Sequence, residues 1–153
     1  MASIEESGCS VPIIYDFNPR GPVTTLGMIP GITLAEFLRS NSRELNISLM
    51  RDLGKFVGLF HLKGVSHGDL TTANIMVGVK NMPYFIDCSF GKSDSTLNDM
   101  ASDIFLFRES LRSLHSDTGE LFSAFSLSYS KINGNHDKIF EEVEKIESRR
   151  RYV

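Results

Sequence analysis

The segment His67–Asp87, HGDLTTANIMVGVKNMPYFID, decides how the rest of this chain is interpreted. It contains an acid at Asp69, an amide at Asn74 and a second acid at Asp87. Two short β-like runs with a turn-prone stretch between them follow Asn74, which predicts a hairpin. Such a hairpin returns Asp87 to the side of Asn74 and Asp69. Hard cations such as Mg²⁺ prefer oxygen ligands and are completed by substrate phosphates, so the segment predicts phosphate chemistry.

The composition is that of an ordinary folded domain. At 153 residues the chain is long enough for one domain with a real core. A net charge of −3 gives no global basic field for nucleic acid. Cys9 and Cys88 lie far apart and do not indicate a secreted disulfide framework. No apolar run approaches the roughly 20 residues of a membrane span, and the first residues lack a signal-peptide layout. We therefore expect a reduced intracellular location without membrane attachment.

The pattern of apolar residues divides the chain into two parts. Residues 1–31 are β-like and punctuated by proline and glycine, with strands expected at 11–15 and 23–26 and a linker at 27–31. The remainder is mostly helical. A first helix is predicted after an N-cap at Thr33, and a second over 49–60 that ends at a glycine cap near Gly64. A third is predicted after Asn98 as N-cap and is expected to be buried all round, because Phe105 and Phe107 lie on nearly opposite sides. Two more are predicted over 119–132 and 137–148.

The motifs of this chain resemble those of one family. His67–Asn74 is similar to the catalytic loop of protein-kinase-like enzymes, H-R-D-x-x-x-x-N, and Asp87 stands where the metal-binding D-F-G motif begins. The form HGDLTT-x-N, the short segment after Asp87 and three later stretches resemble the small atypical kinase/ATPase subunit of the KEOPS (EKC) complex, a family that includes the p53-related protein kinase. Those later stretches are Ala101–Ile104, Arg108–Ser110 and Glu147–Tyr152.

The resemblance implies an α+β, protein-kinase-like fold. Residues 32–153 then form a mostly helical C-lobe with a small β hairpin, and residues 1–31 are a remnant of the N-lobe sheet and hinge. The Gly-rich strands and the nucleotide-binding lysine of the family have no counterpart in this sequence. Because Met1 starts too late for them, we expect either a truncated form or a reduced family member.

The resemblance also implies roles for single residues. Asp69 is the expected catalytic residue, which orients the attacking hydroxyl or water, while Asn74 and Asp87 bind Mg²⁺ and link it to the phosphates of ATP. The adenine is expected to lie against three apolar side chains, Leu26 and Met28 of the hinge and Met76 below it. Met76 is equally well explained as an ordinary core residue.

For other residues the resemblance implies a structural role or a role in contacts with other molecules. His67 is expected to hold the shape of the catalytic loop, and Asp103 to brace the backbone of that loop. Gly68 replaces the arginine that in regulated kinases pairs with a phosphorylated loop, which argues against phospho-switching by that route. The arginine run is either a solvated helix end or a contact to tRNA and a partner subunit: Arg149, Arg150 and Arg151.

The leading hypothesis is a KEOPS-type kinase/ATPase that uses ATP and Mg²⁺. It would support threonylcarbamoyladenosine formation on tRNA through a Kae-type transferase partner, in the cytoplasm and also in the nucleus. One alternative is a non-catalytic scaffold that only docks the transferase. Another is an aminoglycoside-type small-molecule kinase, against which the short segment after Asp87 and the arginine tail argue.

Overall fold

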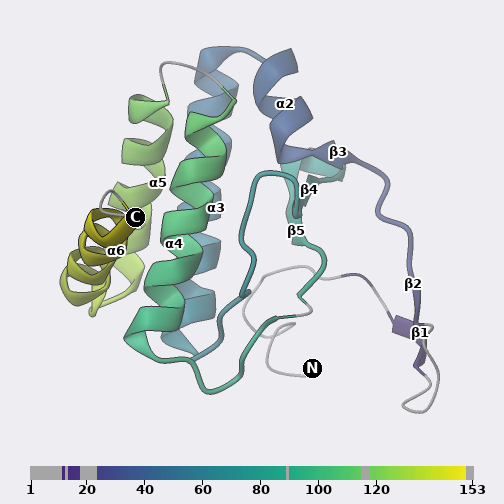
Figure 1. Ribbon diagram of the computed structural model, residues 1–153. Coiled ribbons are helices and arrows are strands. Elements are labelled where there is room, and N and C mark those ends of the chain that lie inside the picture. The colour runs from purple at the N-terminus through teal and green to yellow at the C-terminus, as the bar shows by residue number, and fades with distance from the viewer. Residues whose placement is uncertain (1–11, 13, 18–23, 89, 115–117, 151–153) are drawn as a thin grey trace.

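The computed structural model describes residues 12, 14–17, 24–88, 90–114 and 118–150. Within these ranges the protein is a mixed α+β structure dominated by helices, so the predicted fold class is confirmed (Figure 1). The elements in chain order are β1 Ile14–Phe17, β2 Thr24–Leu26, β3 Ile32–Thr33, α2 Leu34–Ser40, α3 Arg43–Leu62, β4 Ile75–Val77, the 3-10 turn η1 Val79–Asn81, β5 Pro83–Phe85, α4 Leu97–Arg112, α5 Gly119–Ile132 and α6 His136–Arg150.

The predicted hairpin is confirmed. Strand β4 pairs antiparallel with β5, with Ile75 opposite Phe85, and η1 closes the turn between them. The turn needs positive φ at Lys80 and at Asn81, 59° and 58°. The short strand β3 adds to the free edge of β4 and makes a three-stranded sheet, which local patterning did not predict because β3 has only two residues.

The N-terminal strands are only partly as expected. Strand β1 begins at Ile14 and extends through Phe17, so it lies further along the chain than the predicted strand over 11–15. Val11, Ile13 and Val23 are outside the described residues. β1 pairs antiparallel with β2 as a separate two-stranded sheet, and Figure 1 shows this pair apart from the helices.

Two helices begin with reciprocal caps. Thr33 accepts a hydrogen bond from the Glu36 amide at 3.2 Å and its own amide donates to the Glu36 carboxylate at 2.9 Å, which confirms the predicted start of α2. Helix α4 begins after Thr96, so the prediction of Asn98 as N-cap was wrong. Thr96 is the N-cap because Asp99 completes a reciprocal capping box with it. The Asp99 amide donates to the Thr96 hydroxyl at 3.2 Å, and the Thr96 amide donates to the Asp99 carboxylate at 2.9 Å.

The core lies among the helices and under the sheet. Helix α3 packs closely along α5, and α4 packs against α6 (Figure 1). Gly54 and Gly58 of α3 face α5, and a Cβ on Gly54 would lie 2.2 Å from the Phe125 carbonyl oxygen. Phe105 and Phe107 are both buried and no residue from 100 to 111 is exposed, which confirms that this part of α4 is buried all round. None of the helices in the described ranges combines the length and apolarity that a membrane span requires.

Candidate active site

The predicted acid and amide meet at the end of the hairpin. The Asn74 side-chain nitrogen donates to the Asp69 carbonyl oxygen at 2.9 Å and to the Asp69 carboxylate at 2.8 Å. The Ile86 amide donates to the Asn74 carbonyl oxygen at 3.0 Å, so the strands stay paired up to the site. Asp87 follows directly, exposed and with φ of 55°. The spacing thus brings Asp69 and Asn74 into contact and places Asp87 one residue beyond the last pair.

Both ring nitrogens of His67 have hydrogen-bond partners. Its Nε2 lies 3.0 Å from the Ile86 carbonyl oxygen and its Nδ1 accepts from the Asp69 amide at 3.3 Å, which together require the neutral ring with hydrogen on Nε2. Burial lowers the pKa of His67, while the nearby carboxylates, Asp103 first, oppose that effect. The ring also meets Phe85 edge-on, with centroids 5.8 Å apart. This geometry supports a structural role rather than proton transfer.

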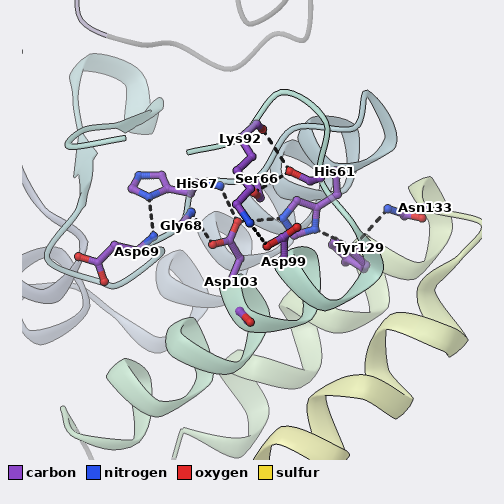
Figure 2. A network of polar contacts seen from close by, with 12 residues as sticks. His61, Ser66, His67, Gly68, Asp69, Lys92, Asp99, Asp103, Tyr129 and Asn133 are labelled. Carbon is purple, nitrogen blue, oxygen red and sulfur yellow. Dashed lines mark hydrogen bonds and ion pairs between the residues drawn. The ribbon is translucent and has the colours of Figure 1, made fainter. Parts of the chain in front are cut away.

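Asp103 of α4 holds the backbone of the same loop. One carboxylate oxygen accepts from the His67 amide at 2.6 Å and the other from the Gly68 amide at 2.8 Å (Figure 2). Asp103 has no exposed surface, so these bonds form without competition from water. The contacts agree with the bracing role expected for this residue.

Gly68 leaves no room for the arginine of regulated kinases. Its φ is +84°, and a Cβ there would lie 2.3 Å from the Phe90 carbonyl oxygen. The segment after Asp87 is fixed in that place, because Ser66 and Lys92 exchange backbone hydrogen bonds of 3.0 and 3.1 Å. The short segment after Asp87 therefore lies directly against the loop that contains Gly68 and Asp69.

Cys88 is unsuited to act as a nucleophile next to this site. Desolvation raises the pKa of its thiol to about 11, helped by the negative charges of Asp103 and Asp87. The thiol therefore stays protonated near neutral pH, and the thiolate is the reactive form.

The three residues expected to hold the adenine are not gathered into one closed pocket. Leu26 is 49% exposed and Met28 is 91% exposed. Met76 is half-buried on β4, opposite Tyr84 of β5. Only Met76 thus belongs to the sheet that carries the catalytic loop, and the hinge positions are open to solvent.

The residues present suit a metal ion that is shared with phosphates. Among the described residues, no three or more His, Cys, Asp or Glu side chains lie close enough together to hold a metal ion. Asn74 directs its amide nitrogen to Asp69, which leaves its carbonyl oxygen as the atom that it can offer a cation. One amide and one or two carboxylates, completed by phosphates and water, are typical of Mg²⁺.

The end of α6 is tied to α4. Arg108, only 8% exposed, donates to Glu144 at 2.8 Å and to Glu147 at 2.6 Å. The Arg150 guanidinium lies 5.2 Å from the centre of the Phe105 ring, and Arg149 beside it is exposed. Arg151 is outside the described residues. Arg150 thus has a packing role in addition to any contact that the tail makes.

Three polar residues near the site had not been predicted. His61 of α3 lies 3.2 Å from the Asp103 carboxylate and 2.8 Å from the Tyr129 hydroxyl, to which Asn133 donates at 3.2 Å. All three are buried. The available signal was a histidine on the apolar stripe of a long helix, but its partners Asp103 and Tyr129 lie 42 and 68 positions further along the chain.

No protein-family model matches the chain. The chain is 33% identical, over its whole length, to a protein of Thermoplasma acidophilum named as a bifunctional tRNA threonylcarbamoyladenosine biosynthesis protein, of which the aligned part makes up 28%. A protein of the same name from Methanococcus maripaludis strain C5 is 29% identical over the whole chain, and 27% of it is covered.

A third relative is shorter. It is the KEOPS complex subunit Bud32 of Pyrococcus abyssi, 29% identical over 97% of this chain and 68% of its own length. The chain thus spans about a quarter of the bifunctional relatives and about two thirds of the single subunit. The resemblance deduced from the catalytic loop is confirmed by these matches: a KEOPS complex subunit Bud32 and a bifunctional tRNA threonylcarbamoyladenosine biosynthesis protein align with 97 to 100% of this chain at 29 to 33% identity.

Proposed function

We propose that this chain is a KEOPS-type kinase/ATPase that acts on Mg-ATP in support of tRNA threonylcarbamoyladenosine formation. The observation that carries the proposal is the pair of hydrogen bonds from the Asn74 amide to the Asp69 backbone and carboxylate, beside Asp87 at the end of the hairpin. In phosphoryl transfer the protein contributes mainly positioning and electrostatic stabilisation, and an acid and metal ligands held in this way supply both.

Each residue of the site has one task in this proposal. Asp69 orients the attacking water or hydroxyl and accepts its proton, and its carboxylate is fixed for this by Asn74. Asn74 and Asp87 hold Mg²⁺, which when bound neutralises charge on the phosphates of ATP. His67, neutral and hydrogen-bonded on both nitrogens, keeps Asp69 next to the strand end and takes no proton itself.

The surroundings of Gly68 bear on the kind of substrate. Gly68 supplies no guanidinium that could bind a phosphorylated loop, and the short segment at Phe90 occupies the space beside the catalytic loop. A broad protein kinase needs a platform there for a substrate peptide. The arrangement therefore favours hydrolysis of ATP, or phosphorylation of one bound partner, over a general protein kinase.

The partner in this proposal is a Kae-type transferase subunit. The names of the relatives support this, because one is a KEOPS subunit and the others are bifunctional threonylcarbamoyladenosine biosynthesis proteins. The exposed end of α6, with Arg149 and its neighbours, is the proposed contact to tRNA or partner, since arginine suits phosphate. We propose the cytoplasm and the nucleus as compartments.

The test measures Mg-ATP hydrolysis by the chain together with the transferase. Asp69→Ala and Asp87→Ala should each abolish the activity, while Asp137→Ala, at an 86% exposed side chain on α6, should leave it unchanged. Undiminished turnover in both site variants, with the unmodified chain active, contradicts the proposal.

One observation favours a second candidate, a scaffold that docks the transferase without catalysis. Leu26 and Met28 are open to solvent instead of enclosing a nucleotide. Titration of the chain with Mg-ATP, alone and with the transferase, separates the two candidates. Saturable binding that Asp87→Ala weakens supports the enzyme, and no binding under either condition supports the scaffold.

A further inference from the structure

A chain of buried polar side chains extends from the catalytic loop to the junction of α5 and α6. Its members are Asp103, His61, Tyr129 and Asn133, which we call the relay (Figure 2). We propose that the relay positions the catalytic loop from the α5–α6 junction, so that Tyr129 and Asn133 are positioning residues for Asp69. The role of Asp69 that this statement uses rests on the proposed function.

The donors and acceptors along the relay follow one another in a single direction, from Asn133 to Asp103. The Asn133 side-chain oxygen accepts from the Asn135 amide at 3.0 Å, so its nitrogen faces Tyr129 and donates to the hydroxyl. Tyr129 then donates its own hydrogen to His61 Nδ1, 2.8 Å away. His61 must carry its hydrogen on Nε2, from which it donates to Asp103.

The end of the relay lies at the loop itself. The Asp103 oxygen that receives the His61 hydrogen bond also receives the one from the His67 amide, and the second oxygen receives the Gly68 amide. Asp69 follows Gly68 directly in the chain. The position of the His61 ring therefore decides whether the carboxylate that fixes the loop keeps its third donor, and the hydrogen bond from Tyr129 to Nδ1 holds the ring in that position.

Tyr129 is well suited to keep its hydrogen. Burial raises the pKa of Tyr129 far above its ordinary value, and the charge of Asp103 adds to this effect. The hydroxyl remains a donor at every physiological pH. Its ring is fixed between Phe125 and Phe140, with centroids 6.1 and 5.8 Å away.

The close packing of α3 on α5 brings the relay together. Gly54 and Gly58 precede His61 on the same face of α3, and a Cβ on Gly58 would lie 3.0 Å from Ile132 Cβ of α5. Because no side chains separate the helices there, the Tyr129 hydroxyl reaches the His61 ring. A polar contact in so close an interface is costly unless it is satisfied, and every member of the relay is.

The junction of α5 and α6 is built around Asn133. Its carbonyl oxygen accepts from the His136 amide at 3.0 Å and its side chain accepts from the Asn135 amide, which together turn the chain into α6. A displacement of this junction would withdraw the donor from Tyr129. The relay therefore couples the place where α6 begins to the loop that carries Asp69.

The first test uses Tyr129→Phe in the full chain. The ring stays, so packing is kept, while His61 loses the donor to Nδ1. Nitrogen-15 NMR should show the His61 Nδ1 resonance shift as it loses its donor while Nε2 keeps its hydrogen toward Asp103, and amide exchange at His67 and Gly68 should rise about tenfold, the effect of losing one buried hydrogen bond. Neither measurement requires nucleotide or partner.

Asn133→Asp gives an independent variant. A carboxylate cannot donate to Tyr129 and instead competes for its hydroxyl hydrogen, while it can still accept from the Asn135 amide. It should therefore weaken the hydrogen bond to His61 Nδ1 and shift that resonance in the same direction as Tyr129→Phe does. Ser128→Ala, which removes a neighbouring buried hydroxyl of α5 outside the relay, is the matched control and should change neither reading.

The results decide the proposal without reference to catalysis. An unchanged His61 Nδ1 resonance in both relay variants overturns it, and so does faster exchange spread evenly over all amides or shared by Ser128→Ala. Where Mg-ATP hydrolysis is measurable, Tyr129→Phe should lower kcat about tenfold and leave KM for ATP unchanged, because positioning and not binding is affected. An unmodified chain without hydrolysis overturns the proposed function alone and leaves the NMR result standing.

Discussion

Gly68 lies at the point where the catalytic loop and the segment after Asp87 touch. Its φ of +84° suits glycine, and a Cβ would overlap the Phe90 carbonyl group at 2.3 Å. Gly68→Ala should therefore lower the free energy of unfolding by about 2 kcal/mol, through backbone strain and displacement of that segment. Urea unfolding measures the change.

The control for this substitution is Gly134→Ala. A Cβ there would meet nothing within 4 Å, so its effect should stay within about 0.5 kcal/mol. Equal losses for the two variants would show that the contact with Phe90 does not constrain Gly68. A further consequence is that arginine at this position cannot restore regulation by a phosphorylated loop, because its Cβ has no place.

At the scale of the elements, packing at the α3–α5 interface decides whether a Gly→Ala substitution stabilises or destabilises the protein. Gly→Ala inside a helix usually stabilises by up to about 1 kcal/mol. At Gly54 the new Cβ would lie 2.2 Å from the Phe125 carbonyl oxygen of α5, so Gly54→Ala should instead destabilise by about 2 kcal/mol. Thermal unfolding gives the comparison with Gly119→Ala, where nothing lies within 4 Å and no loss is expected.

The start of α4 should make the fold sensitive to acid. A hydrogen bond from Lys92, followed by those from the Thr96 backbone and hydroxyl, lowers the pKa of Asp99 from 3.8 to about 2. A folded-state pKa below the unfolded one adds stability above the unfolded value, and this stability is lost as the pH falls toward the folded value. The sensitive window therefore lies between about pH 4 and pH 2.

Asp99→Asn tests this assignment. It should cost about 1 kcal/mol near neutral pH, the usual effect of weakening a cap, and the unfolding free energy should then fall less steeply between pH 4 and pH 2. Urea midpoints over this range provide the measurement. Asp94→Asn, at an exposed residue of the preceding segment, should leave the slope as it is, and a slope unaffected by Asp99→Asn would refute the role of this cap.

The elements differ in how far the sequence predicts them. Local signals were sufficient for the hairpin and for the long helices, because periodicity and turn residues lie within each segment. They were insufficient at Asn98, where two capping residues lie close together and the partner Asp99 decides between them. Strand β3 also depends on β4, which lies more than 40 positions away in the chain.

The candidate site shows the same limit. The five-residue spacing predicts the contact of Asp69 with Asn74, because both belong to one loop. The relay could not be predicted, since His61, Asp103 and Tyr129 come from three helices whose mutual packing is decided by Gly54 and Gly58. The solvent exposure of Leu26 and Met28 could likewise not be predicted, because it depends on contacts between segments.

At the scale of the whole molecule, the site and the core belong to the same part of the chain. Among the residues that the structure describes, every buried member of the hydrophobic core lies between Leu34 and Val143, and the catalytic loop lies inside that range. Strands β1 and β2 form their own two-stranded sheet, a unit that is marginal in water by itself. Gly31 is the point where the two parts of the chain meet, because a Cβ there would lie 2.3 Å from the Val77 carbonyl oxygen of the other sheet. We therefore propose a boundary between residues 1–31 and 32–153.

Limited digestion with thermolysin tests this boundary. The first cut should fall within residues 26–30, at Leu26, Met28 or Ile29, because this stretch joins the two sheets and Met28 is almost fully exposed. The remaining fragment should unfold cooperatively within about 3 °C of the intact chain, since every core residue that the structure describes remains in it. If Leu26 and Met28 contact the adenine, the fragment should also bind Mg-ATP more weakly than the intact chain. A first cut inside α3 or α5, or a fragment without a cooperative transition, would mean that the β1–β2 sheet is part of the core and that the boundary is misplaced.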